Sequence, residues 1–419
     1  MLGSLPITAT FSGKHFVRMI RGRVTRRLLA VALSAVGLLA CCSVTSFIRS
    51  GGGVGVADGP GRPKVRLAWR ASTGALRSSA FASNGRFLCT VRPDGTLSVY
   101  SSSGTRRFSA RIPGATDAVV TGDARYTLAY SRRNPANSTL VFLDATGAKF
   151  WQTEVDGAVW SADACATPGG ARFAVGTGRN YVYIIDLGEN RRRYRRWRAP
   201  GAVSSIALVA GGDDVIYATW QRSVIGRATV RGRKTWENSA EPCSIHYVQV
   251  LGSEDRILAR AVPNRPGADG VYALLSGEGN IISRGALPAS ENARVLVAPN
   301  GRYVCVGTDR LIRHKGKCMR ERHAMLLDDS GRVLCDKGSP FFRAEPVHVT
   351  SAGYVLLMSD RQELFTLSPT GRLSPALKTS APMTHGASSR DGSRLLFQSK
   401  GGSLFMVSAS HNDAAAVQE

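Results

Sequence analysis

The most constraining feature of this sequence is a pattern of turns and apolar runs that recurs eight times between residues 65 and 410. Copies open on a polar turn, for example SNGR (83–86), PNGR (299–302) or RDGSR (390–394). Two strand-length apolar runs follow, then a turn with glycine or small polar residues, then a basic or aromatic run. A period of about 40–50 residues is typical of a solenoid or a propeller, in which neighbouring copies bury one another's apolar faces.

The runs are rich in β-branched and aromatic residues and are bounded by turns, which predicts strands. Seven copies are complete, whereas the eighth stops after SLFMVS (403–408), and an unassigned strand, VRLAWRAS (65–72), stands at the front. Pairing that strand into the last copy would remove the two free edges of a ring. We therefore predict an all-β fold, an eight-bladed β-propeller with four-stranded antiparallel blades, in residues 64–410. Seven blades remain if one weak copy is an insertion.

The N-terminus predicts export. Residues 1–27 form a basic n-region with six cations and no acid, and residues 28–48 (LLAVALSAVGLLACCSVTSFI) are mostly apolar. This pattern indicates a signal peptide or a transmembrane anchor. LLAC (38–41) resembles a lipoprotein lipobox, which makes Cys41 a lipidation candidate. A lipoprotein and a single-span anchor would both tether the propeller to a membrane on the extracytoplasmic side, periplasmic or at the cell surface.

Two further segments are expected to lie outside the propeller. Residues 49–63 are rich in glycine and proline, which predicts a flexible linker. Residues 411–419 (HNDAAAVQE) are expected to be a disordered tail.

The formal net charge is +25, and the excess beyond the n-region is nearly all arginine. Such a surface favours anionic partners, among them lipid headgroups, envelope polyanions and acidic proteins. We do not expect nucleic acid as a partner, because a tethered extracytoplasmic domain would rarely meet it.

Cysteine usage gives two expectations. Cys89 and Cys305 occupy the same place in two copies, inside apolar runs, and are expected to be buried thiols. Cys318 and Cys335 flank one predicted strand, and the sequence leaves open whether they form a disulfide.

The stretch DATGAKFW (144–151) resembles the repeat of the PQQ-like β-propellers, with Asp144, Thr146, Gly147 and Trp151 at the matching positions. The resemblance covers the propeller as architecture, although only this copy matches closely. In such a repeat the Asp-to-Gly stretch makes the turn before the outer strand, and the indole packs between neighbouring blades. The residues expected to dock blades in this way are Trp69, Asp144, Gly147, Trp151, Trp197 and Trp236.

That family includes BamB-like lipoproteins, which are scaffolds of outer-membrane protein assembly, and quinoprotein dehydrogenases. The resemblance to the dehydrogenases implies a vicinal disulfide and calcium-binding acids, but the only adjacent cysteines are Cys41 and Cys42, inside the apolar segment. No carboxylate cluster suited to calcium occurs either. His246, His348 and His385 fall in predicted inner strands but at different depths, which argues against a shared metal. We expect no catalytic residue, metal or cofactor.

The longest insertion between two predicted strands is the basic segment RLIRHKGKCMRER (310–322), expected to project as a loop from one face. Loops on one face of a repeat array are where such folds usually bind. The expected partner-binding residues are Arg310, Arg313, Lys315, Lys317, Arg320 and Arg322.

The sequence thus favours a membrane-tethered, non-catalytic scaffold for protein–protein interaction or assembly in the cell envelope. The alternatives are a sensor or receptor that binds a small molecule in the channel and, with less support, a degenerate quinoprotein enzyme.

Overall fold

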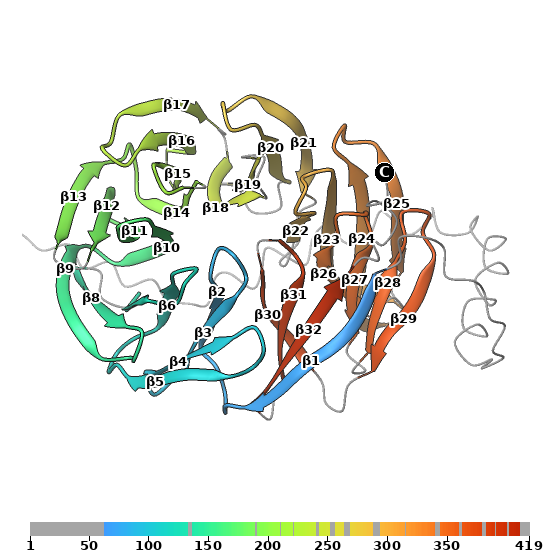
Figure 1. Ribbon diagram of the computed structural model, residues 1–419. Coiled ribbons are helices and arrows are strands. Elements are labelled where there is room, and N and C mark those ends of the chain that lie inside the picture. The colour runs from blue at the N-terminus through green and yellow to red at the C-terminus, as the bar shows by residue number, and fades with distance from the viewer. Residues whose placement is uncertain are drawn as a thin grey trace, which may run out of the picture. The chain divides into compact units, whose positions relative to one another are not determined.

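The computed structural model describes residues 63–410 apart from short gaps. The gaps are 133–135, 189–190, 210, 221, 240–242, 252–255, 264–268, 288–293, 315, 340–343, 360–362, 379–382, 390 and 400–401. The described residues form eight four-stranded antiparallel sheets, the blades of a β-propeller. Figure 1 shows the blades following one another along the chain. This confirms the predicted all-β fold and the number of blades.

The strands of the first four blades, from inner to outer, are β2 (Ser78–Phe81), β3 (Phe87–Val91), β4 (Thr96–Ser101) and β5 (Arg106–Arg111); β6 (Asp117–Val120), β7 (Tyr126–Tyr130), β8 (Asn137–Asp144) and β9 (Lys149–Asp156); β10 (Val159–Thr167), β11 (Gly170–Thr177), β12 (Tyr181–Leu187) and β13 (Arg192–Arg198); and β14 (Val203–Leu208), β15 (Asp214–Thr219), β16 (Val224–Thr229) and β17 (Lys234–Ser239).

The strands of the last four blades, in the same order, are β18 (Cys243–Leu251), β19 (Arg256–Pro263), β20 (Gly270–Leu275) and β21 (Ile281–Leu287); β22 (Arg294–Val297), β23 (Tyr303–His314), β24 (Lys317–Asp328) and β25 (Val333–Ser339); β26 (Ala344–Val349), β27 (Val355–Ser359), β28 (Glu363–Leu367) and β29 (Leu373–Lys378); and β30 (Met383–Ser388), β31 (Arg394–Ser399), β32 (Ser403–Ser410) and β1 (Lys64–Ser72).

Blade 8 joins the two ends of the propeller sequence. β1 pairs antiparallel with β32, so that Lys64 lies opposite Ser410 and Ser72 opposite Ser403. Figure 1 shows β1, in blue, beside β32, in red. Across the seam to blade 1, Arg394 donates from Nη1 to the Gly85 carbonyl at 2.7 Å. The predicted pairing of the N-terminal strand into the last blade is confirmed.

The apolar core lies mainly between neighbouring blades. Phe142 of β8, for example, meets Phe173 of β11 edge to face, with ring centroids 5.4 Å apart. The thiols of Cys89 and Cys305 are buried in this core, as expected. Burial raises the pKa of the Cys89 thiol to about 12, so it stays protonated at neutral pH.

The N-terminal predictions lie outside the described residues, including the n-region 1–27, the apolar segment 28–48, Cys41 and most of the linker 49–63. The predicted tail 411–419 also lies outside them. Within the part of the chain that is described, no helix has the length and hydropathy to cross a membrane.

Candidate functional site

Strand direction divides the propeller into two faces. The four strands of a blade alternate in direction. The turn between second and third strands therefore lies on the same face as the connection to the next blade. We call this the hairpin face, because it carries the β23–β24 hairpin. The turns between first and second strands and between third and fourth strands lie on the opposite face.

The β23–β24 hairpin contains the basic segment 310–322. The prediction of a loop is wrong here, because β23 continues to His314 and β24 begins at Lys317. Gly316, with φ of +77°, makes the tight turn between them. The register places Arg310 opposite Glu321 and Leu311 opposite Arg320. Their backbones are paired in a ladder, so the segment is a two-stranded arm.

The expected partner-binding residues are spread along this arm. Arg310 and Arg313 belong to β23, whereas Lys317, Arg320 and Arg322 belong to β24. Lys315 lies outside the described residues.

Three rings form a row on the hairpin face where blades 3, 4 and 5 meet. Trp160 lies 5.4 Å from Trp220, and Trp220 lies 5.2 Å from His246, measured between ring centroids. Trp220 leaves 42% of its surface exposed. We call Trp160, Trp220 and His246 the aromatic row. Sequence reasoning missed it, because neither tryptophan follows a turn into an outer strand as Trp151 follows Gly147.

Two β-bulges bring the row together. The pairing of β10 with β11 shifts register between Val159 and Ser161, which leaves Trp160 as the extra residue. The pairing of β18 with β19 shifts between Ile245 and Tyr247, which leaves His246 as the extra residue. A bulge re-aims the side chain of the inserted residue. Here both inserted rings lie against Trp220, which follows β15.

Cations stand beside the aromatic row. Burial lowers the pKa of His246, and the charge of Arg260 lowers it further. Burial also lowers the pKa of Arg260, with Arg294 as a second cause. The Nε of Arg260 is buried without a hydrogen-bond partner. Arg294 is balanced by Glu345, at 3.6 Å from Nη1 to Oε1. The site therefore joins exposed ring surface to a half-buried cation.

Tyr247, the next residue of the inner strand β18, adds another accessible aromatic surface. It leaves 43% of its surface exposed, and its hydroxyl donates to Gln249 Oε1 at 3.0 Å. Desolvation by the surrounding protein nevertheless raises its pKa to about 12.

The lowered pKa of His246 predicts a pH-dependent stability. Below about pH 6.5 the unfolded chain binds a proton at this residue more readily than the folded chain does. The free energy of unfolding therefore decreases as the pH is lowered. Urea unfolding at about pH 7.5 and 5.5 should show a smaller acid-induced loss in His246→Gln than in the parent protein. Equal losses in the two proteins would contradict the assignment.

The opposite face holds a cavity of about 580 Å3 at the inner ends of blades 1 to 4 and 8. Its carboxylates already have partners, since Asp163 accepts from the Leu208 N–H at 2.8 Å and Asp391 accepts from the Ser389 hydroxyl at 2.6 Å. Cys165 lies on its wall, where burial raises the pKa of the thiol to about 11. These groups hold turns and strands in place, and the thiol is not poised as a nucleophile.

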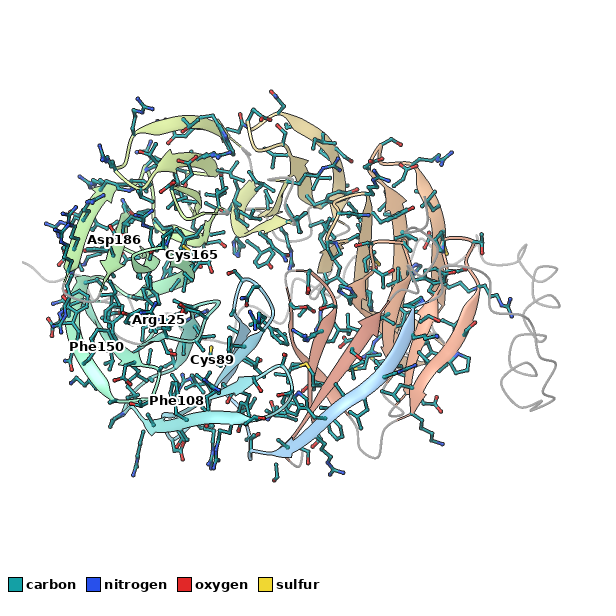
Figure 2. The ribbon with its side chains drawn as sticks, in the orientation of Figure 1. Cys89, Phe108, Arg125, Phe150, Cys165 and Asp186 are labelled. Atoms are coloured by element: carbon teal, nitrogen blue, oxygen red, sulfur yellow. The ribbon has the colours of Figure 1, made fainter. Side chains whose placement is uncertain are left out.

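Aromatic side chains of four outer strands pack on glycines in the next blade. A Cβ added to these glycines would lie 2.5 to 2.8 Å from the nearest ring atom, and each glycine has a positive φ. The pairs are Trp69 with Gly104, Phe108 with Gly147, Trp197 with Gly232 and Trp236 with Gly279. Figure 2 labels Phe108, on the outer strand of blade 1.

Hydrogen bonds reinforce two of these contacts. Trp69 donates from Nε1 to the Ser102 carbonyl at 3.0 Å, and Trp236 donates to the Gly277 carbonyl at 2.9 Å. Both acceptors lie two residues before the glycine of the pair. The indoles are therefore held in position as well as packed.

Asp144 shapes the turn that presents Gly147. Its Oδ1 accepts from the Thr146 N–H at 2.8 Å and from the Ala148 N–H at 3.0 Å. Trp151 follows this turn but meets no glycine of blade 3. It stacks on Phe142 of its own blade at 4.8 Å, and Arg192 of blade 3 lies over its ring at 6.0 Å.

The remaining candidate ligands do not converge. Cys318 and Cys335 are both free thiols, which answers the question that the sequence left open. His348 is buried in β26, whereas His246 lies in the aromatic row. The side chain of His385 lies outside the described residues. Within the described ranges, no three His, Cys, Asp or Glu side chains group in a way that could hold a metal ion.

The chain was compared with protein-family models, curated proteins and solved structures, and only the solved structures gave matches. No protein-family model matches the chain, and no curated protein matches it. The PQQ-like resemblance of residues 144–151 therefore stays a prediction. Among solved structures, BamB from Moraxella catarrhalis is similar with a TM-score of 0.55 and 14% identity, over 83% of this chain and 98% of that chain. The Dos1 propeller is similar with a TM-score of 0.59 and 10% identity, over 83% and 95%. At these identities the likeness establishes one point, that the chain belongs among the β-propellers.

Proposed function

We propose that this protein is a non-catalytic interaction scaffold that binds an acidic, aromatic-bearing segment of a protein partner on its hairpin face. The observation that carries the proposal is the aromatic row, in which a 42%-exposed Trp220 stands between Trp160 and His246. The β23–β24 arm projects from the same face.

An exposed tryptophan between two other rings is a typical anchor of a protein interface. Tryptophan, tyrosine and arginine are the residues that most often dominate binding energy, because they combine a large apolar area with a polar group. Here Trp220 and Tyr247 supply ring surface, and Arg260 supplies a half-buried positive charge. A carboxylate of the partner would pair with that charge while an apolar side chain covers Trp220.

The charge of this face selects the sign of the partner. Arg179 and Arg222 are exposed in the turns beside the aromatic row, and the arm adds the basic segment 310–322. Complementary charge speeds association and disfavours basic partners. Other propellers such as BamB share this fold, and we extend the scaffold role to this chain on the strength of the aromatic row.

The test is a titration of a fluorescein-labelled short synthetic peptide, with alternating acidic and phenylalanine residues, against the protein, followed by the fluorescence anisotropy of the label. Trp220→Ala should weaken binding by about 30-fold or more, the usual loss at a dominant interface residue. Arg260→Met should weaken it by a similar factor, because it removes the positive charge beside the aromatic row. A peptide with lysine in place of the acids should not bind measurably.

Tyr194→Ala is the matched control, because Tyr194 is also 42% exposed but lies on the outer strand β13. It should leave the affinity unchanged. Equal binding by the Trp220→Ala variant would overturn the proposal. Binding of a small apolar anion at the same affinity as the peptide would favour the sensor alternative instead.

The membrane tether is a separate part of the proposal and rests on the sequence of residues 28–48. Intact mass of the protein extracted from membranes distinguishes its two forms. A chain that begins at Cys41 with a diacylglyceryl adduct identifies a lipoprotein, and an unprocessed N-terminus identifies a single-span anchor. A mature chain without lipid or apolar segment would exclude both.

A further inference from the structure

The first blade and the strand that closes the ring carry an unusual imbalance of charge. Residues 64–116 contain nine lysines and arginines but only one acid, Asp94. Four of these cations stand near the start of the outer strands β1 and β5 and are exposed: Lys64, Arg66, Arg106 and Arg107. We call these four residues the basic rim.

Trp69 lies between the two halves of the rim. β1 belongs to blade 8 and β5 to blade 1, and Trp69 of β1 contacts blade 1 by stacking on Tyr100 of β4 with centroids 6.0 Å apart. The Nε1 of Trp69 also donates to the Ser102 carbonyl, just before β5. Both outer strands start on the opposite face, because the third-to-fourth-strand turns lie there. The rim is therefore on the side away from the aromatic row.

Among the residues that the structure describes, no acid pairs with the rim. Asp94 lies in the β3–β4 turn, on the hairpin face, with its Oδ2 3.7 Å from Arg92. None of the four rim residues has an ion-pair partner among the described residues. The arginine-rich strand β13 differs, since Arg195 pairs with Asp186 and Arg196 pairs with Asp156. The basic rim is thus unneutralised among the described residues along two neighbouring outer strands, whereas β13 is partly balanced.

We propose that the basic rim binds the anionic headgroups of a phospholipid membrane. The described chain begins at Pro63, beside Lys64, and the apolar segment ends at Ile48. A glycine-rich linker of this length has a typical end-to-end distance of about 20 Å. The argument from linker length rests on the proposed tether, whereas the argument from charge does not. A tethered rim close to an anionic leaflet would gain about fivefold in affinity for each cation near the surface.

Contact through the rim has a consequence for the proposed function. The hairpin face lies on the other side of the propeller, so it would point away from the membrane and stay accessible to a partner. The tether would then hold the protein at the membrane, the basic rim would contact the membrane surface, and the aromatic row would bind the partner.

The test uses residues 59–419, a compact unit that contains all eight described sheets and the β1–β32 pair but lacks the apolar segment. Sedimentation is measured with vesicles of phosphatidylcholine alone and with vesicles that contain about a third phosphatidylglycerol. We expect binding to the anionic vesicles only, and its loss at about 0.5 M salt. The variant Lys64→Glu, Arg66→Glu, Arg106→Glu, Arg107→Glu should bind about 100-fold more weakly or worse.

The matched control reverses four exposed cations on the outer strands and turns of blades 4 to 6. It carries Arg231→Glu, Arg233→Glu, Arg284→Glu and Lys337→Glu, and should retain most of the binding. Equal losses in both variants would show a response to net charge alone and would overturn the assignment to the rim. So would equal binding to neutral vesicles, or inhibition by millimolar inorganic phosphate, which would identify a free-phosphate site.

Far-UV circular dichroism and the melting temperature show whether each variant is folded. Because this protein lacks residues 1–58, failure of the vesicle test leaves the tether to be judged by intact mass. Failure of the peptide titration would contradict the proposed function but not the lipid binding of the basic rim, since the two surfaces share no residue.

Discussion

Deletion of β1 (Lys64–Ser72) is expected to abolish the cooperative unfolding of the propeller. The deletion removes the whole outer strand of blade 8 and exposes the edge of β32 from Ser403 to Ser410. It also removes Trp69 from the seam with blade 1, where the indole packs on Gly104 and donates to Ser102. An uncovered edge strand is a template for aggregation, so we expect aggregated protein or a greatly lowered melting temperature.

A second variant keeps this prediction testable if the deleted protein fails to fold. Trp69→Ala should lower the free energy of unfolding by about 3 kcal/mol, near the lower end for loss of a large aromatic side chain. Leu67→Ala is its control, because Leu67 lies on the same strand but is 46% exposed. It should change stability by less than about 1 kcal/mol. Urea unfolding followed by circular dichroism measures both.

Addition of a synthetic peptide with the sequence of residues 64–72 to the deleted protein should restore part of the lost stability. An unchanged melting temperature after the deletion would refute the view that β1 holds the ring closed.

Gly147→Ala is expected to destabilise the protein far more than Gly114→Ala. Both glycines have a positive φ, +85° and +80°, so both substitutions strain the backbone. An added Cβ at Gly147 would lie 2.5 Å from Phe108 Cδ2, whereas nothing lies within 4 Å of one at Gly114. The strain amounts to about 1–2 kcal/mol at each site. The clash should add about 1–3 kcal/mol at Gly147 alone.

A double-mutant cycle isolates the contact between blades. Phe108→Ala removes the ring that the new methyl group would strike, so Gly147→Ala should be less damaging in that background. Additive effects of the two substitutions would show that the ring and the glycine do not act together. Chemical unfolding of the four proteins supplies the free energies.

The sequence predicted most of the fold because its signals are local. Turns such as SNGR (83–86) act over four residues, and the apolar runs between them have the length of strands. The surplus strand around Trp69 and the incomplete last copy each lacked a partner, so their pairing followed from the need to close a ring. Residues 310–322 were misread as a loop because their charges hid the strand pattern, although Gly316 is a tight-turn signal.

The candidate site could not be predicted in this way. Trp160, Trp220 and His246 come from three blades, and two register shifts of one residue place their rings side by side. A shift of one residue changes where a side chain points without changing the local composition that sequence reasoning uses. The contacts of Trp151 could not be predicted either. The repeat resemblance predicts that its ring packs between blades, and the ring does meet blade 3, but through the side chain of Arg192 and not through a glycine.

By itself, the sequence determined that this chain is a ring of repeated four-stranded blades, closed by its own first strand, because strand and turn preferences depend on neighbouring residues. The tertiary structure alone decided where recognition can occur. Packing between blades brought three distant rings and the half-buried Arg260 onto one face, and strand direction placed the exposed cations at the starts of β1 and β5 on the other. Contacts between residues tens or hundreds of positions apart depend on register and blade packing, which local preferences do not specify.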